Sequence, residues 1–68
     1  MNTKIQITND GGHVYQDGTI ISVEQLFRDY RDTLTEANMS TYHWLCRIPI
    51  PSAVDFIAKA LGFDYKII

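Results

Sequence analysis

The stretch "SVEQLFRDYRDTL", which runs from Ser22 to Leu34, predicts an amphipathic helix. Ser22 is a favourable N-cap residue, and Gln25 follows it at the spacing of a capping box. Apolar residues then recur at intervals of three and four, which places them on one stripe of a helix. The stripe consists of Val23, Leu26, Phe27, Tyr30 and Leu34. We therefore expect a helix that begins after Ser22 and buries this stripe.

The segment before this helix has the pattern of β structure. In "KIQIT", Ile5 and Ile7 alternate with polar residues, as in a strand with one buried face. The cluster "NDGG", residues 9–12, is a turn in which the glycines can adopt positive φ. Asp17 and Gly18 suit a two-residue type I′ turn between "HVYQ" and "TIIS". We expect two or three short antiparallel strands here.

The segment "STYHWLCRI", residues 40–48, fits two structures. As a strand it places Tyr42, Trp44, Cys46 and Ile48 on one face. As a helix it groups Met39, Tyr42, Leu45 and Cys46. The aromatic and β-branched content favours the strand, and the helix remains open.

The last part of the chain predicts a helix followed by a strand. Pro49 and Pro51 interrupt the preceding element, and Ser52 is a suitable cap for a new helix, with Asp55 near its positive dipole end. Gly62 suits the end of this helix. The expected inner face consists of Val54, Ile57, Ala58 and Leu61. The tail "FDYKII" is apolar enough for a strand that pairs with residues 3–8.

These elements make residues 1–68 one small α+β domain. We expect an N-terminal antiparallel hairpin or meander, packed on two or three helices, with a short C-terminal strand. A chain of this length buries only about 60% of the surface that it exposes when unfolded. The predicted core consists of Ile5, Ile7, Ile20, Leu26, Phe27, Tyr30, Leu34, Ile57 and Leu61.

Composition narrows the class of protein. The one cysteine, Cys46, cannot form an intramolecular disulfide, and no apolar run reaches the length of a membrane span. We therefore expect a cytoplasmic protein with no membrane partner. The net charge of −2, from eight acidic and six basic residues, lacks the basic excess that is usual in nucleic-acid-binding modules.

The segment "RIPIPSAVDFIAKALGF", from Arg47 to Phe63, resembles the end of the helix-turn-helix of Cro-like and Xre-type phage repressors. In that family a proline follows the recognition helix, and a later helix ends in a segment like "AKALG". Pro49 and the residues 58–62 match this spacing, and the resemblance covers roughly residues 38–63. It implies a DNA-binding transcriptional regulator. The base-contacting residues would be Asn38, Ser40, Thr41 and His43.

Other features disfavour DNA reading. The small-residue and glycine pattern that packs the first helix and turn of that family is missing. No Lys or Arg occurs between Thr33 and Trp44, although a recognition helix needs phosphate anchors around it. Glu36 would face the phosphates. DNA binding is therefore kept as the alternative function.

The sequence offers no catalytic or metal-binding constellation. His43 and Cys46 are three residues apart, but a structural zinc site needs four ligands, and only His13 or a carboxylate could complete it. A catalytic Cys46 would need an orienting group and an oxyanion site as well. We therefore expect no enzyme, no cofactor and no metal.

The leading hypothesis is a small, mildly acidic, non-catalytic module that docks on a larger protein or complex and inhibits or modulates it. Short chains of this type are typical of phage and mobile-element products that block or redirect a host complex. Aromatic and Arg side chains dominate such binding surfaces. The expected surface consists of Tyr42, Trp44 and Arg47, with Arg28, Asp29 and Asp32 of the first helix. Homodimerisation is also consistent with so short a chain.

Overall fold

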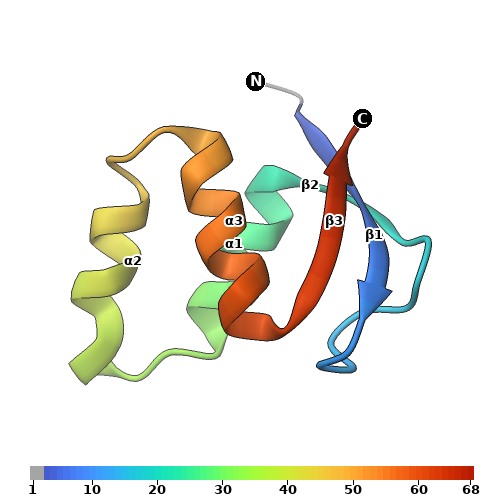
Figure 1. Cartoon of the computed structure of the whole chain (residues 1–68). Coiled ribbons are helices and arrows are strands. Elements are labelled where there is room, and N and C mark those ends of the chain that lie inside the picture. Colours follow the sequence, from blue (N-terminus) through green and yellow to red (C-terminus); the bar gives the residue numbers. More distant parts are fainter. Residues whose placement is uncertain (1–2) are drawn as a thin grey trace.

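The computed structural model of the chain describes residues 3–68 and has two layers (Figure 1). A three-stranded antiparallel sheet forms one layer, the helices of residues 23–32 and 50–61 lie on one of its faces, and the helix of residues 39–45 lies beyond them, away from the sheet. The predicted α+β class, the N-terminal hairpin and the C-terminal strand are confirmed. The elements are β1 (Lys4–Asp10), β2 (Ile20–Ser22), α1 (Val23–Asp32), a 3-10 turn (Glu36–Asn38), α2 (Met39–Leu45), α3 (Ile50–Leu61) and β3 (Phe63–Ile67).

The sheet has the order β2-β1-β3, so β1 is its central strand. Ile5 lies opposite Ile21 of β2 and Ile67 of β3, and Ile7 lies opposite Tyr65. Alternate residues of a strand face opposite sides, so Ile5 and Ile7 both face the helices and are buried. The predicted pairing of the C-terminal tail with the first strand is therefore confirmed.

The loop between β1 and β2, residues 11–19, differs from the prediction. "HVYQ" is not a strand. Asp17 and Gly18 do form a two-residue turn, closed by the N–H of Thr19 donating to the carbonyl of Gln16 at 3.1 Å, but it is not type I′, because Asp17 does not take positive φ. The Asp17 carboxylate also accepts the N–H of Asp10 at 2.8 Å, and the Asp10 carboxylate accepts the N–H of Tyr15. These side-chain bonds hold a longer loop. Gly18 takes positive φ, as the turn chemistry suggests. Gly11 and Gly12 of "NDGG" do not, and the residue that follows them, His13, has a φ of 58°.

Helix α1 begins as predicted. The Ser22 hydroxyl accepts the N–H of Gln25 at 3.1 Å, which satisfies one of the free donors at the helix start. The Gln25 side chain turns away from the cap and donates to Asp29 at 2.7 Å. Val23, Leu26 and Tyr30 of the predicted stripe are buried.

Residues 39–45 form a helix, α2, so the strand that the sequence favoured is wrong. The helical alternative grouped Leu45 with Met39, Tyr42 and Cys46, and of these Leu45 is buried, with an exposed fraction of 1%. Burial of one leucine at helical spacing outweighs the strand preference of the aromatic residues, because that preference is weak and depends on context.

Helix α3 begins at Ile50, three residues earlier than expected, and Ser52 does not cap it. Pro49 is the N-cap residue and Pro51 lies in the first turn, where a missing N–H removes no helical hydrogen bond. Asp55 therefore lies beyond the first turn and pairs with Lys59 at 3.0 Å. The helix ends as predicted at Gly62, which takes a φ of 85° and donates to Ala58.

The core lies between the sheet and the helices. Of the predicted members, Ile5, Ile7, Leu26, Tyr30 and Ile57 are buried, and Phe27, Leu34 and Leu61 lie at its margin. The prediction that Ile20 belongs to the core is wrong. Ile20 pairs with Gln6 on the face of the sheet that points away from the helices, and it is 53% exposed. The core also includes Val23, Val54 and Ala58, which the sequence placed on the inner faces of the helices, and Leu45, Ala53 and Phe63, which the predicted core did not include. None of the helices within residues 3–68 combines the length and apolarity needed to cross a bilayer.

Candidate functional site

Two large aromatic side chains are exposed side by side where α2 meets α3. Trp44 of α2 is 50% exposed and Phe56 of α3 is 38% exposed. Their rings meet edge to face, with centroids 5.5 Å apart and an interplanar angle of 76°. Their chain neighbours Leu45 and Ile57 are buried, so the two rings come from the outer sides of their helices.

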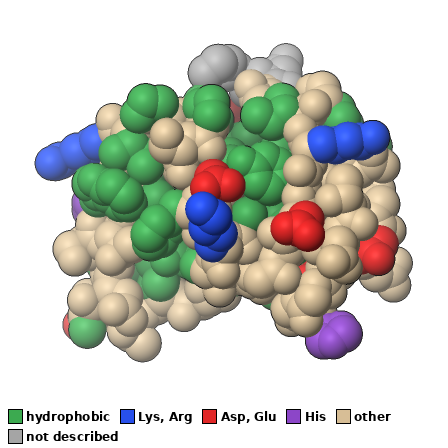
Figure 2. Space-filling view, in the orientation of Figure 1, with side chains coloured by type: hydrophobic (Ala, Val, Ile, Leu, Met, Phe, Trp, Pro, Cys, Tyr) green, Lys and Arg blue, Asp and Glu red, His purple; other side chains and the backbone are tan. Residues whose placement is uncertain are grey.

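These rings border a surface hollow of about 400 Å³, which we call the Trp44 groove. Its apolar walls are Trp44, Ile48, Pro49 and Phe56, and the Asp55–Lys59 ion pair lies at its side. In Figure 2, hydrophobic side chains gather on this part of the molecule, over α2 and α3. The short connection through Pro49 brings the two helices together and so forms the groove.

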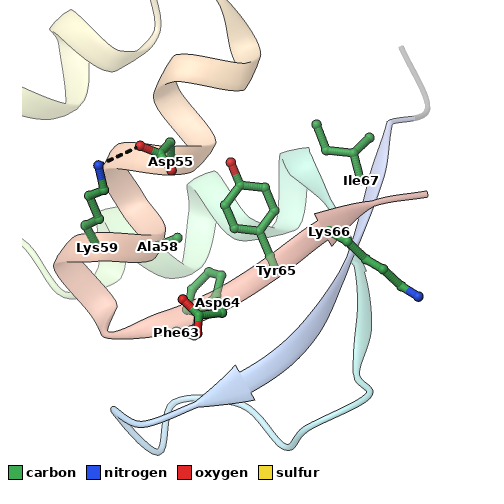
Figure 3. Close-up of a pocket in the computed structure, with 8 residues that line it drawn as sticks. All are labelled: Asp55, Ala58, Lys59, Phe63, Asp64, Tyr65, Lys66 and Ile67. Carbon is green, nitrogen blue, oxygen red and sulfur yellow. Dashed lines mark ion pairs between the residues drawn. The ribbon is translucent and has the colours of Figure 1, made fainter.

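A second hollow, of about 610 Å³, lies between α3 and β3, and we call it the β3 groove. Figure 3 shows Tyr65 on its floor, pointing from β3 towards the Asp55–Lys59 pair of α3. Burial raises the pKa of the Tyr65 phenol, the Asp55 carboxylate raises it further, and Lys59 opposes them. Asp55 and Lys59 line both grooves, so their ion pair lies between the two.

The structure separates two of the predicted binding residues, Tyr42 and Trp44. Residues two apart on a helix point about 200° away from each other. Tyr42 accordingly packs towards α1, with its ring centroid 6.4 Å from that of Phe27. Trp44 packs towards α3. A strand would have placed both rings on one face, so this grouping depended on the wrong secondary structure.

The predicted polar residues lie elsewhere. Arg28, Asp29 and Asp32 are on α1, and Arg47 is exposed just after α2. Asp29 has an internal role, because its carboxylate accepts the Tyr15 hydroxyl at 2.6 Å and the Gln25 amide at 2.7 Å. Of the six predicted residues, Trp44 lines the Trp44 groove, whereas Tyr42 packs on the α1 side of α2.

The four residues of the DNA-binding alternative lie in or beside α2, a helix of seven residues. Ser40 and His43 are exposed, and Thr41 is partly buried. Asn38 precedes the helix, and its side-chain amide lies 3.4 Å from the Thr35 hydroxyl. Arg47 is the first cation along the chain after them.

Across residues 3–68, no group of three or more His, Cys, Asp or Glu side chains is placed to hold a metal ion. His43 lies in α2 and Cys46 is its C-cap residue, and both are exposed.

Sequence reasoning did not include Phe56, Ile48 and Pro49 in the binding surface. One signal was present, since Phe56 is a large apolar residue outside the inner stripe of its helix. No protein-family model matches this chain, and the comparisons with curated proteins and with solved structures found no match either.

Proposed function

We propose that this chain is a non-catalytic docking module that binds a larger protein through the Trp44 groove and so inhibits or modulates it. The observation that supports this proposal is the exposed Trp44–Phe56 pair beside an apolar hollow. Tryptophan is among the residues that contribute most to binding energy at protein interfaces. An exposed apolar patch bounded by charges is also typical of interaction sites.

The groove defines the chemistry of the partner segment. Its apolar walls suit one bulky aliphatic or aromatic side chain, inserted between Trp44 and Pro49. The Asp55–Lys59 pair at its side presents both charges, so a polar group beside the anchor can pair with either. We therefore expect an amphipathic segment of a folded protein as the ligand.

A photo-crosslinking experiment tests this proposal. A photoreactive amino acid replaces Ser52, which lines the groove, and the chain is mixed with a lysate of its source cells, with and without nuclease treatment. We expect a defined protein to be cross-linked. Trp44→Ala and Phe56→Ala should abolish the cross-link, whereas the matched variant Tyr42→Ala, on the other side of α2, should retain it.

Two results would contradict the proposal. Equal cross-linking by the Trp44→Ala, Phe56→Ala and Tyr42→Ala variants would show that the groove is not the binding surface. Capture that disappears on nuclease treatment, together with salt-sensitive binding of the purified chain to duplex DNA, would support the alternative. In that case Asn38, Ser40, Thr41 and His43 would be the residues to substitute.

A further inference from the structure

Strand β3 forms an open edge of the sheet. In the described chain it is hydrogen-bonded to β1 alone. The N–H of Ile68 donates to the carbonyl of Lys4 at 3.1 Å, so the even-numbered residues direct their backbone groups towards β1. Ile7, opposite Tyr65, uses its own N–H and C=O on the β2 side. Tyr65 and Ile67 therefore turn their N–H and C=O groups outward.

The side chains of β3 alternate between two chemistries. Phe63, Tyr65 and Ile67 lie on the side of the helices, and Figure 3 shows Tyr65 and Ile67 on that side while Lys66 points away. Asp64 and Lys66 lie on the opposite face, two residues apart and of opposite charge. Within residues 3–68 neither of them takes part in an ion pair, and both are exposed.

We infer that β3 pairs with β3 of a second copy of this chain, antiparallel about a twofold axis at Tyr65, so that the two sheets become one. In this register Asp64 lies opposite the partner's Lys66, and Ile67 lies opposite the partner's Phe63. Each pair occurs twice, because a twofold interface uses the same surface on both copies. The outward N–H of each Tyr65 would donate to the outward C=O of the other, which gives two hydrogen bonds at the twofold axis.

The charge pattern selects this register. The outward backbone groups require odd-numbered residues to pair with odd-numbered residues, so the next allowed registers are shifted by two. One shift puts Asp64 opposite the partner's Asp64, and the other puts Lys66 opposite the partner's Lys66. Like charges directly opposite each other destabilise a strand pair, whereas opposite charges stabilise it. An edge lysine commonly prevents unwanted pairing, and here it leaves one favourable register.

Apolar burial supports the same arrangement. Ile67 is 52% exposed in the single chain, beside the β3 groove. In the joined sheet the partner's Tyr65 and the partner's Ile67 lie on the helix side, next to this groove. Their burial covers apolar surface that a chain of this length leaves exposed.

Sedimentation equilibrium of the full chain, from micromolar to millimolar concentration, tests the inference. We expect a reversible species of about twice 7.8 kDa. Asp64→Lys and Lys66→Asp should each weaken dimerisation roughly tenfold or more, because both symmetric pairs become repulsive. The double variant, which has the original net charge and reversed pairs, should restore it. Glu36→Lys changes the net charge as Asp64→Lys does, away from β3, and should have no effect.

Hydrogen exchange gives a second readout. The amides of Tyr65 and Ile67 should become protected as concentration rises, whereas that of Lys66, directed at β1, should be protected throughout. A 7.8 kDa species at millimolar concentration would overturn the inference. So would a dimer that both single swaps leave intact, or concentration-independent exchange at Tyr65. Trp44→Ala should dimerise normally, so this test is independent of the proposed docking function.

Discussion

The amide of Gly12 donates to the carbonyl of Gly62 at 3.0 Å, which fixes the β1–β2 loop on the turn between α3 and β3. A Cβ atom at Gly12 would overlap the backbone oxygen of Leu61, so this close approach requires glycine. A Cβ atom at Gly11 would meet its nearest neighbour, the oxygen of Gly62, at 3.4 Å. The two adjacent glycines therefore have different structural roles.

Substitution of these glycines separates the two roles. We expect Gly12→Ala to lower the free energy of unfolding by about 1–3 kcal/mol, because the backbone must move to accept the methyl group. Gly11→Ala is the matched control and should change it by less than about 1 kcal/mol. Urea denaturation followed by circular dichroism measures both. Equal effects of the two variants would contradict the close approach at Gly12.

The loop is also held to α1 by the Tyr15 hydroxyl. Tyr15→Phe removes the 2.6 Å hydrogen bond to Asp29 but keeps the edge-to-face contact of the ring with Phe63, whose centroid is 5.7 Å away. We expect a loss of about 1 kcal/mol of stability, the usual net contribution of an intramolecular hydrogen bond, because the site is only partly buried. Tyr65→Phe is the matched control and should cost less. A Tyr15→Phe variant as stable as the wild type would show that this bond does not hold the loop.

The same tyrosine predicts a dependence of stability on alkaline pH. Burial raises the pKa of the Tyr15 phenol above its ordinary value of 10.0, and the bond to Asp29 and the charges of Asp29 and Asp10 raise it further. Because the folded pKa is higher than the unfolded one, this stabilisation is complete below about pH 10 and is lost as the pH rises towards the folded pKa. The urea concentration at the unfolding midpoint should fall as the pH rises through this range, and it should fall less steeply in Tyr15→Phe. Identical slopes would contradict the assignment.

Adjacent residues of α2 should differ sharply in their effect on stability. Leu45 is buried in the core, so Leu45→Ala should cost about 2–5 kcal/mol. Trp44→Ala removes a half-exposed ring and its contact with Phe56, and should cost about 1 kcal/mol. Thermal and urea denaturation of the two variants measure this difference. A larger loss from Trp44→Ala would contradict the helical placement of residues 39–45.

The elements that the sequence predicted correctly are those with a strong local pattern. The alternation of Ile5 and Ile7, the apolar stripe after Ser22 and the glycine at position 62 each have a direct physical meaning, and the structure agrees with each. Helix α2 was misread because its signal was short and its aromatic content favours strands only weakly. The loop was misread because the carboxylates of Asp10 and Asp17 determine its path.

The candidate site was predicted only in part, for the same reason. Trp44 was identified from residue type, but its neighbours in space depend on how α2 packs on α3. Phe56 lies twelve residues further along the chain, and no local pattern links the two. Tyr42 was grouped with Trp44 because a strand would have aligned them.

The most direct test of the docking surface uses the fluorescence of Trp44, which is the single tryptophan of the chain. The protein captured by cross-linking is purified and titrated into the free chain, while emission and acrylamide quenching are recorded. The docking account predicts a blue shift and strong protection from quenching at saturation, because the partner covers the half-exposed ring. Emission and quenching that stay unchanged while binding is complete would show that the partner binds elsewhere and would contradict the account.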